Sequence, residues 1–123
     1  MPTVLVVDDE WAIAGWLDAI ISDAGHRVLA ASNGKQALEV LENESIDLVI
    51  TDFMMPLVDG PTLINAMRTE PRTADIPIIV MTALPETTVR QRLDGYAAFL
   101  RKPFREVELL EALAKVLGPR ASP

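Results

Sequence analysis

Residues 46–56 read IDLVITDFMMP, and this stretch decides the fold class of the chain. A short apolar run ends abruptly in one carboxylate, Asp52, and the turn-forming pair Asp59-Gly60 follows soon after. Such a run predicts a strand buried on both faces, as in a parallel sheet. Open α/β sheets keep their chemistry at the carboxyl ends of their strands. Asp52 is therefore either a simple strand end or a functional acid, and the rest of the chain has to distinguish the two.

A short apolar strand followed by an amphipathic helix occurs five times along the chain. We predict strands over residues 3–7, 28–31, 48–51, 78–81 and 97–100. We predict helices over residues 11–24, 35–43, 61–69, 85–93 and 105–117. In the last helix we expect four inward residues, Val107, Leu110, Leu113 and Leu117. This alternation predicts an α/β fold, with helices covering both faces of one parallel sheet and right-handed crossovers.

Composition narrows the classes of function. The chain has 123 residues, half of them hydrophobic, which fits one domain with a real core. Its formal charge of -7 argues against general nucleic-acid binding, and the absence of cysteine excludes a thiol nucleophile or a zinc-thiolate site. We find no signal-peptide pattern and no apolar run of membrane-spanning length, so we expect a cytoplasmic protein with no membrane contact. The single histidine, His26, lies in a predicted turn, where we expect it to be solvated rather than a metal ligand.

Polar side chains end several of the predicted strands. Because the carboxyl ends of parallel strands meet at one edge of the sheet, these side chains should share a rim. They are Asp8 and Asp9 after the first strand, Asp52 after the third, Thr82 after the fourth and Lys102 after the fifth. Clustered carboxylates invite Mg²⁺, and an ionised aspartate is a competent nucleophile toward phosphorus. A lysine ammonium and a hydroxyl would hold the oxygens of a transferred phosphoryl group.

The motifs at these strand ends resemble those of the bacterial two-component response-regulator receiver domain. They are the VVDDE, DFMMP, DG, MTA and KPF motifs at residues 6–10, 52–56, 59–60, 81–83 and 102–104. The resemblance spans about residues 4–117, with the motifs in the family's order and near-normal spacing. It implies a flavodoxin-like (βα)5 doubly wound sheet with strand order 2-1-3-4-5, of the single-domain, chemotaxis-regulator kind.

The resemblance also implies a role for each matching residue. Asp52 would accept the phosphoryl group, and Mg²⁺ (or Mn²⁺) would be held by Asp8, Asp9, Asp52 and the main-chain carbonyl of Met54. The residues implied for phosphoryl binding and switching are Lys102, Thr82, Ala83 and Phe99. The Lys102-Pro103 bond is expected to be cis. Phosphorylation would switch the face formed by the fourth helix, fifth strand and fifth helix.

Partners follow from the same resemblance. The donor would be a histidine kinase or a histidine phosphotransfer protein, and the output would be a downstream protein target, with no direct DNA binding. We expect a monomer or weak dimer that catalyses its own phosphorylation and dephosphorylation without turning over a separate substrate. Residues 1–118 would form the receiver domain, with 119–123 as a short tail or the start of a linker.

Two departures from the family pattern stand out. The segment between Thr82 and Lys102 is about two residues shorter than usual, so the fourth helix should be short or displaced. Met54 and Leu84 are apolar where many relatives carry polar side chains that could orient a hydrolytic water, so we expect slow autodephosphorylation.

Three other readings of the sequence are less well supported. A phosphohydrolase would need an acid in place of Met54, and a nucleotide- or flavin-binding module would need a glycine-rich phosphate loop. A degenerate receiver would not keep the full set of acids, threonine and lysine.

Overall fold

The computed structural model describes residues 1–55 and 57–118, so the expectations about Pro56 and the 119–123 tail lie outside the described residues. Its five strands are β1 (Thr3–Val7), β2 (Arg27–Ala31), β3 (Leu48–Asp52), β4 (Ile78–Thr82) and β5 (Ala98–Arg101). They form one parallel sheet in the order β2-β1-β3-β4-β5, which confirms the predicted topology. The helices are α1 (Trp11–Asp23), α2 (Gly34–Asn43), α3 (Gly60–Thr69), α4 (Glu86–Arg90) and α5 (Glu106–Leu117).

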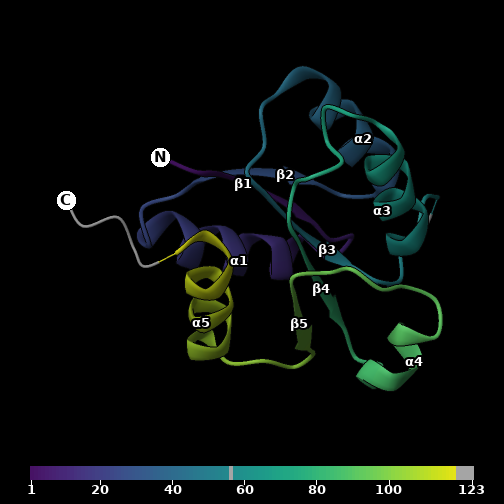
Figure 1. Cartoon of the computed structure of the whole chain (residues 1–123). Coiled ribbons are helices and arrows are strands. Elements are labelled where there is room, and N and C mark those ends of the chain that lie inside the picture. The colour runs from purple at the N-terminus through teal and green to yellow at the C-terminus, as the bar shows by residue number, and fades with distance from the viewer. Residues whose placement is uncertain (56, 119–123) are drawn as a thin grey trace.

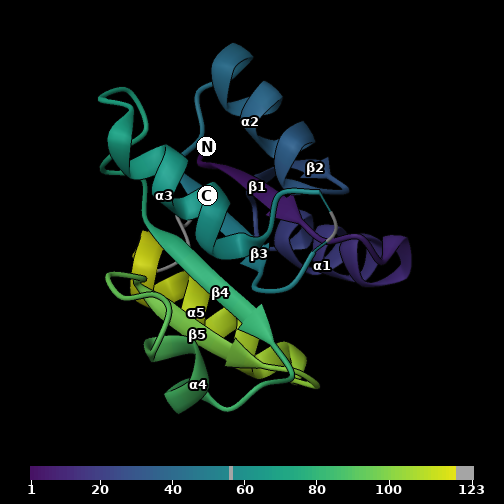
Figure 2. The same cartoon turned by 90° about the vertical axis from the view of Figure 1, so that its right-hand side faces the viewer.

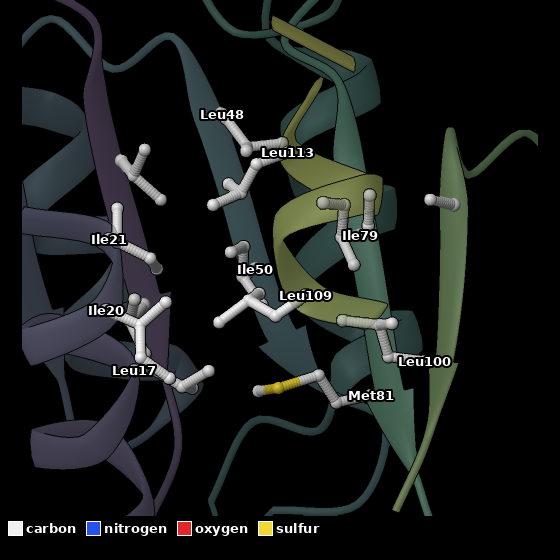
Figure 3. Close-up of a cluster of buried hydrophobic side chains, with 14 residues drawn as sticks. Leu17, Ile20, Ile21, Leu48, Ile50, Ile79, Met81, Leu100, Leu109 and Leu113 are labelled. Carbon is white, nitrogen blue, oxygen red and sulfur yellow. The ribbon is translucent and has the colours of Figure 1, made fainter. Parts of the chain in front are cut away.

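Helices cover both faces of the sheet (Figure 1). Alternate residues of the central strands point to opposite faces, so the strands contribute to two separate cores. One core lies beneath α1 and α5, and Figure 3 shows Leu17, Ile20 and Ile21 of α1 and Leu109 and Leu113 of α5 packed over the same face of the sheet. The other core lies beneath α2, α3 and α4. The central strands β1, β3 and β4 are buried along their whole length, as their apolar sequences predict.

Local capping fixes where two of the helices begin. The Asn33 side chain accepts a hydrogen bond from Gln36 N at 2.8 Å at the start of α2. The Asp59 side chain accepts one from Thr62 N at 3.0 Å at the start of α3, where Pro61 occupies the first turn. Both are standard N-caps, which satisfy an N–H that the helix itself leaves unpaired.

The fourth helix is short, as the reduced spacing predicts. It spans five residues, Glu86–Arg90, and ends before the expected boundary near Leu93. The chain then continues in turns, in which the N–H groups of Arg92 and Leu93 both donate to the carbonyl of Val89, at 3.0 and 2.9 Å. Gly95 follows with φ +76°, a conformation that glycine adopts without strain. Figure 2 shows α4 beyond β5 at one edge of the sheet, well apart from α3.

Two expectations about packing are wrong, one about the inward face of α5 and one about His26. In α5, Leu113 is buried as expected, but Val107 and Leu110 are 44% and 37% exposed, and the buried residues beside Leu113 are Leu109 and Ala112. The apolar residues of this helix form two overlapping stripes. The stripe that packs against α1 and the sheet contains Leu109 and Ala112, and it differs from the stripe that we predicted from periodicity.

His26 is buried at 9% exposure rather than solvated. The turn at Gly25, with φ +96°, directs His26 into the space between α1 and α5, where it helps to line a cavity of about 280 Å³. No helix among residues 1–55 and 57–118 is long and apolar enough to cross a membrane.

Candidate functional site

Three carboxylates meet at the carboxyl edge of the sheet. Asp8 follows β1 directly, Asp52 is the last residue of β3, and Asp9 lies one residue beyond Asp8. One carboxylate oxygen from each lies within 4.8 Å of the others. Asp8 and Asp52 are buried at 2% and 6% exposure, whereas Asp9 is exposed. We call these three acids, together with Lys102, the acid pocket.

Lys102 reaches this pocket from the end of β5. Its Nζ lies 3.0 Å from Asp8 Oδ2 and 2.9 Å from Asp52 Oδ1, and its side chain is 17% exposed. The Lys102-Pro103 peptide bond is cis, as expected. Main-chain hydrogen bonds hold the strand ends in place, with Lys102 N donating to Thr82 O and Phe53 N donating to Met81 O, both at 2.8 Å. The ammonium group is therefore fixed between two carboxylates that lie 94 and 50 residues earlier in the chain.

The environment of the pocket shifts the pKa of both partners. Burial raises the pKa of Asp52 from 3.8 to about 7, the hydrogen bond from Lys102 opposes this rise, and the negative charge of Asp8 adds to it. Burial acts to lower the pKa of Lys102, but hydrogen bonds to Asp52 and Asp8 outweigh it, so this pKa lies above its usual 10.5. Lys102 is therefore a cation throughout the physiological pH range.

Thr82 and its neighbours line the next part of the rim. Thr82 is 4% exposed, and its hydroxyl accepts a hydrogen bond from Leu84 N at 3.3 Å. Ala83, directly after β4, is exposed, and its carbonyl accepts a hydrogen bond from Arg101 Nε at 3.2 Å. Phe99 is half-buried on β5, and its ring centroid lies 6.3 Å from that of Tyr96. Thr82 and Phe99 thus lie on the adjacent strands β4 and β5, and Ala83 follows Thr82 directly.

Close backbone approaches fix the loop that follows Asp52. A Cβ at Gly60 would lie 2.6 Å from the Asp52 carbonyl oxygen and 2.9 Å from Phe53 Cα, so only glycine fits there. Gly34 at the start of α2 is pressed against Val58 in the same way. Leu57, in the same loop, adopts φ +67°, which is rare for a side chain of this kind. The sequence identified Asp59-Gly60 as a turn but did not reveal these contacts.

Arg92 is a neighbour of this loop that sequence reasoning missed. Its guanidinium lies 5.3 Å from the centroid of the Phe53 ring, and its Nη2 lies 3.4 Å from Asp59 Oδ2. It therefore joins the segment after α4 to the two ends of the loop that follows Asp52. Arg92 is 33 residues from Asp59, and no local pattern connects them.

The donor set fits a hard divalent cation. Three clustered carboxylates against one ammonium leave net negative charge in a largely buried place, and Mg²⁺ prefers carboxylate oxygens together with waters and phosphoryl oxygens. The Met54 side chain is 63% exposed and offers no oxygen, so a contribution from this residue would come from its main-chain carbonyl. An acid beside a fixed ammonium and a cation site has what phosphoryl transfer requires, which is positioning and charge neutralisation.

The fold and this pocket define a phosphoacceptor of the CheY-like class, and comparison with known proteins agrees. Residues 4–114 match the response regulator receiver domain family, so the chain belongs to that family of two-component signalling proteins. It is 32% identical to the DNA-binding dual master transcriptional regulator RpaA of Synechocystis, over 95% of this chain and 49% of that protein. The chain spans about half the length of the curated relatives it matches.

Solved structures give the same assignment. The chemotaxis response regulator CheY4 of Vibrio cholerae superposes with a TM-score of 0.89 at 30% identity, over 94% of this chain and 98% of that one. The receiver domain of the Pseudomonas aeruginosa sensor histidine kinase PA1611 has a TM-score of 0.87 at 27% identity, over 95% of this chain and 98% of that one. That structure was determined with a magnesium ion coordinated in its active-site cleft.

Proposed function

We propose that Asp52 is the residue of this receiver that accepts the phosphoryl group. The observation that carries the proposal is the position of its carboxylate, with Lys102 Nζ 2.9 Å from Oδ1 and two further acids within reach of a shared cation. An Asp52 oxygen would attack phosphorus and form a P–O bond. The N–P bond to a donor histidine would break, and the freed imidazole nitrogen would take a proton.

The other residues hold the charges that move during this transfer. Lys102 would pair with a phosphoryl oxygen, and the Thr82 hydroxyl would give up Leu84 N to bind another, next to Ala83. Asp8, Asp9, Asp52 and the Met54 carbonyl would hold Mg²⁺, which supplies charge neutralisation for the phosphoryl oxygens. The magnesium-bound PA1611 receiver supports the choice of Mg²⁺, and Mn²⁺, with similar oxygen ligands, is the alternative.

Signalling would follow from a change in packing beside the pocket. If Thr82 moves toward a phosphoryl group, it vacates space beside β5, and Phe99 would turn inward to fill it. The ring contact between Phe99 and Tyr96 would then change, and with it the α4–β5–α5 face. The five-residue α4 makes this face different from that of receivers with a longer fourth helix, so we infer a different partner or dimer mode.

The phosphoryl donor would be a histidine kinase or a histidine phosphotransfer protein. The downstream partner would be a protein that binds the α4–β5–α5 face. We propose that residues 1–118 act as a cytoplasmic receiver, monomeric or weakly dimeric, that modifies itself without turning over a separate substrate. The acidic charge of -7 supports output through protein contacts rather than direct DNA binding by this domain. RpaA, by contrast, is a DNA-binding regulator about twice as long as this chain.

Incubation with acetyl phosphate and Mg²⁺ tests the proposal. The intact mass should rise by one phosphoryl group, and EDTA should prevent the gain. Asp52→Asn is the matched variant, because it keeps the shape of the side chain and removes the nucleophile. If the folded wild type stays unmodified, or the variant gains the same mass, the proposal fails.

A further inference from the structure

A cleft between α3 and the segment that follows α4 has no part in the mechanism above. Its volume is about 770 Å³, within the range of small-molecule sites, and it is lined by residues of α3 and by residues 90–95. The segment after Arg90 runs in turns rather than continuing the helix, and it forms one wall of the cleft.

Three arginines line this cleft, although the chain as a whole carries a formal charge of -7. Arg68 comes from α3, Arg90 ends α4, and Arg92 lies in the turns beyond it. One acid, Asp94, lines the cleft with them. A guanidinium group can bind two oxygens of an anion side by side, so three arginines along one cleft suit a ligand with more than one anionic group.

Arg68 supplies a fixed positive charge. Its Nη1 donates to the carbonyls of Ala74 and Ile76 at 2.8 and 3.1 Å, and its Nη2 donates to the carbonyl of Gly95 at 3.1 Å. These acceptors are neutral, and Arg68 makes no ion pair within residues 1–55 and 57–118. The guanidinium is thus held in place by the segment between α3 and β4 and by Gly95 of the cleft wall, without its charge being cancelled.

Arg90 and Arg92 supply charges that are largely exposed to solvent. Arg90 Nη2 lies 3.2 Å from Glu86 Oε2 and Arg92 Nη2 lies 3.4 Å from Asp59 Oδ2, and the two arginine side chains are 68% and 56% exposed. Exposed pairs of this kind contribute little to stability and exchange partners readily. An anion in the cleft could therefore recruit both side chains at small cost.

We propose that this cleft binds a ligand with two or more linked phosphate groups, either a nucleotide or an inorganic polyphosphate. Arg68, Arg90 and Arg92 bind the phosphate oxygens, and the Asn65 and Gln91 amides offer further donors. The half-buried side chain of Leu93 in the wall of the cleft would pack against the base of a nucleotide, a contact that bare polyphosphate cannot make. Because Arg92 also contacts Phe53 and Asp59, the bound ligand changes the contacts of the loop that follows Asp52.

Isothermal titration calorimetry tests this proposal. The dissociation constants of the full chain for ATP and for tripolyphosphate are measured in Mg²⁺-free buffer at low salt. The double variant Arg90→Gln/Arg92→Gln should bind at least about tenfold more weakly, because two charge-assisted contacts are lost. The control is Arg27→Gln/Arg105→Gln, which removes the same charge from two exposed pairs elsewhere, with Glu44 and Glu108, and should bind within about twofold of wild type. Asp59→Asn/Glu86→Gln should bind more tightly than wild type, since it frees both arginines.

The two ligands distinguish the sources of the phosphate. Tighter binding of ATP identifies a nucleotide site, and equal binding identifies a polyphosphate site. Amide NMR signals of residues 90–95 should shift on titration, which places the ligand in the cleft. The proposal is overturned if neither ligand binds, if the control double variant loses as much affinity as the cleft variant, or if the shifts are confined to the neighbourhood of Lys102.

Discussion

The acid pocket and residues 86–95, which we call the α4 segment, differ in how far their ion pairs are exposed to solvent. In the pocket, the side chains of Lys102, Asp8 and Asp52 are 17%, 0% and 8% exposed, and their contacts are 2.9–3.0 Å long. In the α4 segment, Arg90 and Arg92 are 68% and 56% exposed and their contacts are 3.2 and 3.4 Å long. Charges removed from water interact strongly and keep one geometry, whereas solvated pairs exchange easily.

We infer from this difference that the acid pocket carries the proposed phosphoryl transfer and that the region around α4 carries the proposed partner binding. The pocket is built on strand ends, where backbone pairing fixes each group, which suits a reaction that depends on positioning. The α4 segment is built on turns and one short helix, which suits a surface that changes its contacts when the pocket is modified. Substitutions should accordingly affect phosphorylation in the first region and binding in the second.

The largest effect should come from Lys102. Replacing it with glutamine removes the ammonium group that faces Asp8 and Asp52, so the rate of phosphorylation by acetyl phosphate should fall about 100-fold or more. The rate is measured as the initial gain of intact mass in Mg²⁺. Lys115→Gln makes the same change on the exposed face of α5 and should leave the rate unchanged. If Lys102→Gln is phosphorylated at the wild-type rate, Lys102 does not contribute to the reaction.

Gly60→Ala should have the next largest effect, on stability. The added Cβ would meet backbone atoms of Asp52 and Phe53 at 2.6 and 2.9 Å, and these cannot move aside cheaply, so the free energy of unfolding should fall by about 1–3 kcal/mol. Gly15→Ala in α1 has no atom within 4 Å and should instead stabilise by about 1 kcal/mol. Urea unfolding measures both. Equal stability of the two variants would show that the loop after Asp52 is not tightly held.

The lifetime of the phosphorylated form should be long. Met54 and Leu84 lie two residues after Asp52 and Thr82, and neither side chain orients a water for hydrolysis. Met54→Asn should shorten the half-life by about threefold to tenfold, since positioned polar groups accelerate proton transfer. Leu57→Asn, the same kind of change on an exposed residue of the same loop, is the control. Wild-type decay within seconds, followed by intact mass, would contradict this expectation.

Asp59 should show the smallest effect, and a pH-dependent one. Hydrogen bonds from Thr62 hold the pKa of Asp59 below 3.8, so its stabilisation is present above that pH and is lost as the pH falls through the lowered pKa. Asp59→Ala should cost about 1 kcal/mol at pH 7 through loss of the α3 cap. Asp59→Asn keeps the cap and should lose the part of the pH dependence that Asp59 contributes. Urea unfolding of the three proteins at pH 7 and pH 3 measures these free energies. If Asp59→Ala is as stable as wild type at pH 7, the Asp59 cap does not stabilise the fold.

The sequence predicted correctly which polar side chains meet at the carboxyl ends of the strands. Asp8, Asp52 and Lys102 were predicted to meet because parallel strands carry their last residues to one edge, and they do. The alternation of elements predicted a parallel sheet, and the resemblance to receiver domains implied its strand order. The short α4 was predictable from the spacing before β5, which is reduced relative to that family.

The contacts that sequence could not reveal depend on packing between distant segments. Val107 and Leu110 were assigned inward because α5 carries apolar residues on two overlapping stripes, and its neighbours make the choice. Arg92 meets Phe53 only because α4 ends early and the chain turns back toward the loop. His26 is buried because α5 packs over its turn, which no local pattern indicates.

The most direct measurement identifies the phosphorylated residue. After incubation with acetyl phosphate and Mg²⁺, borohydride reduces an aspartyl phosphate to homoserine, and peptide mass spectrometry locates it. We predict homoserine at position 52, absent when EDTA is added. Homoserine at position 8 or 9, or an unreacted position 52 in protein that has gained a phosphoryl group, would contradict the assignment of Asp52.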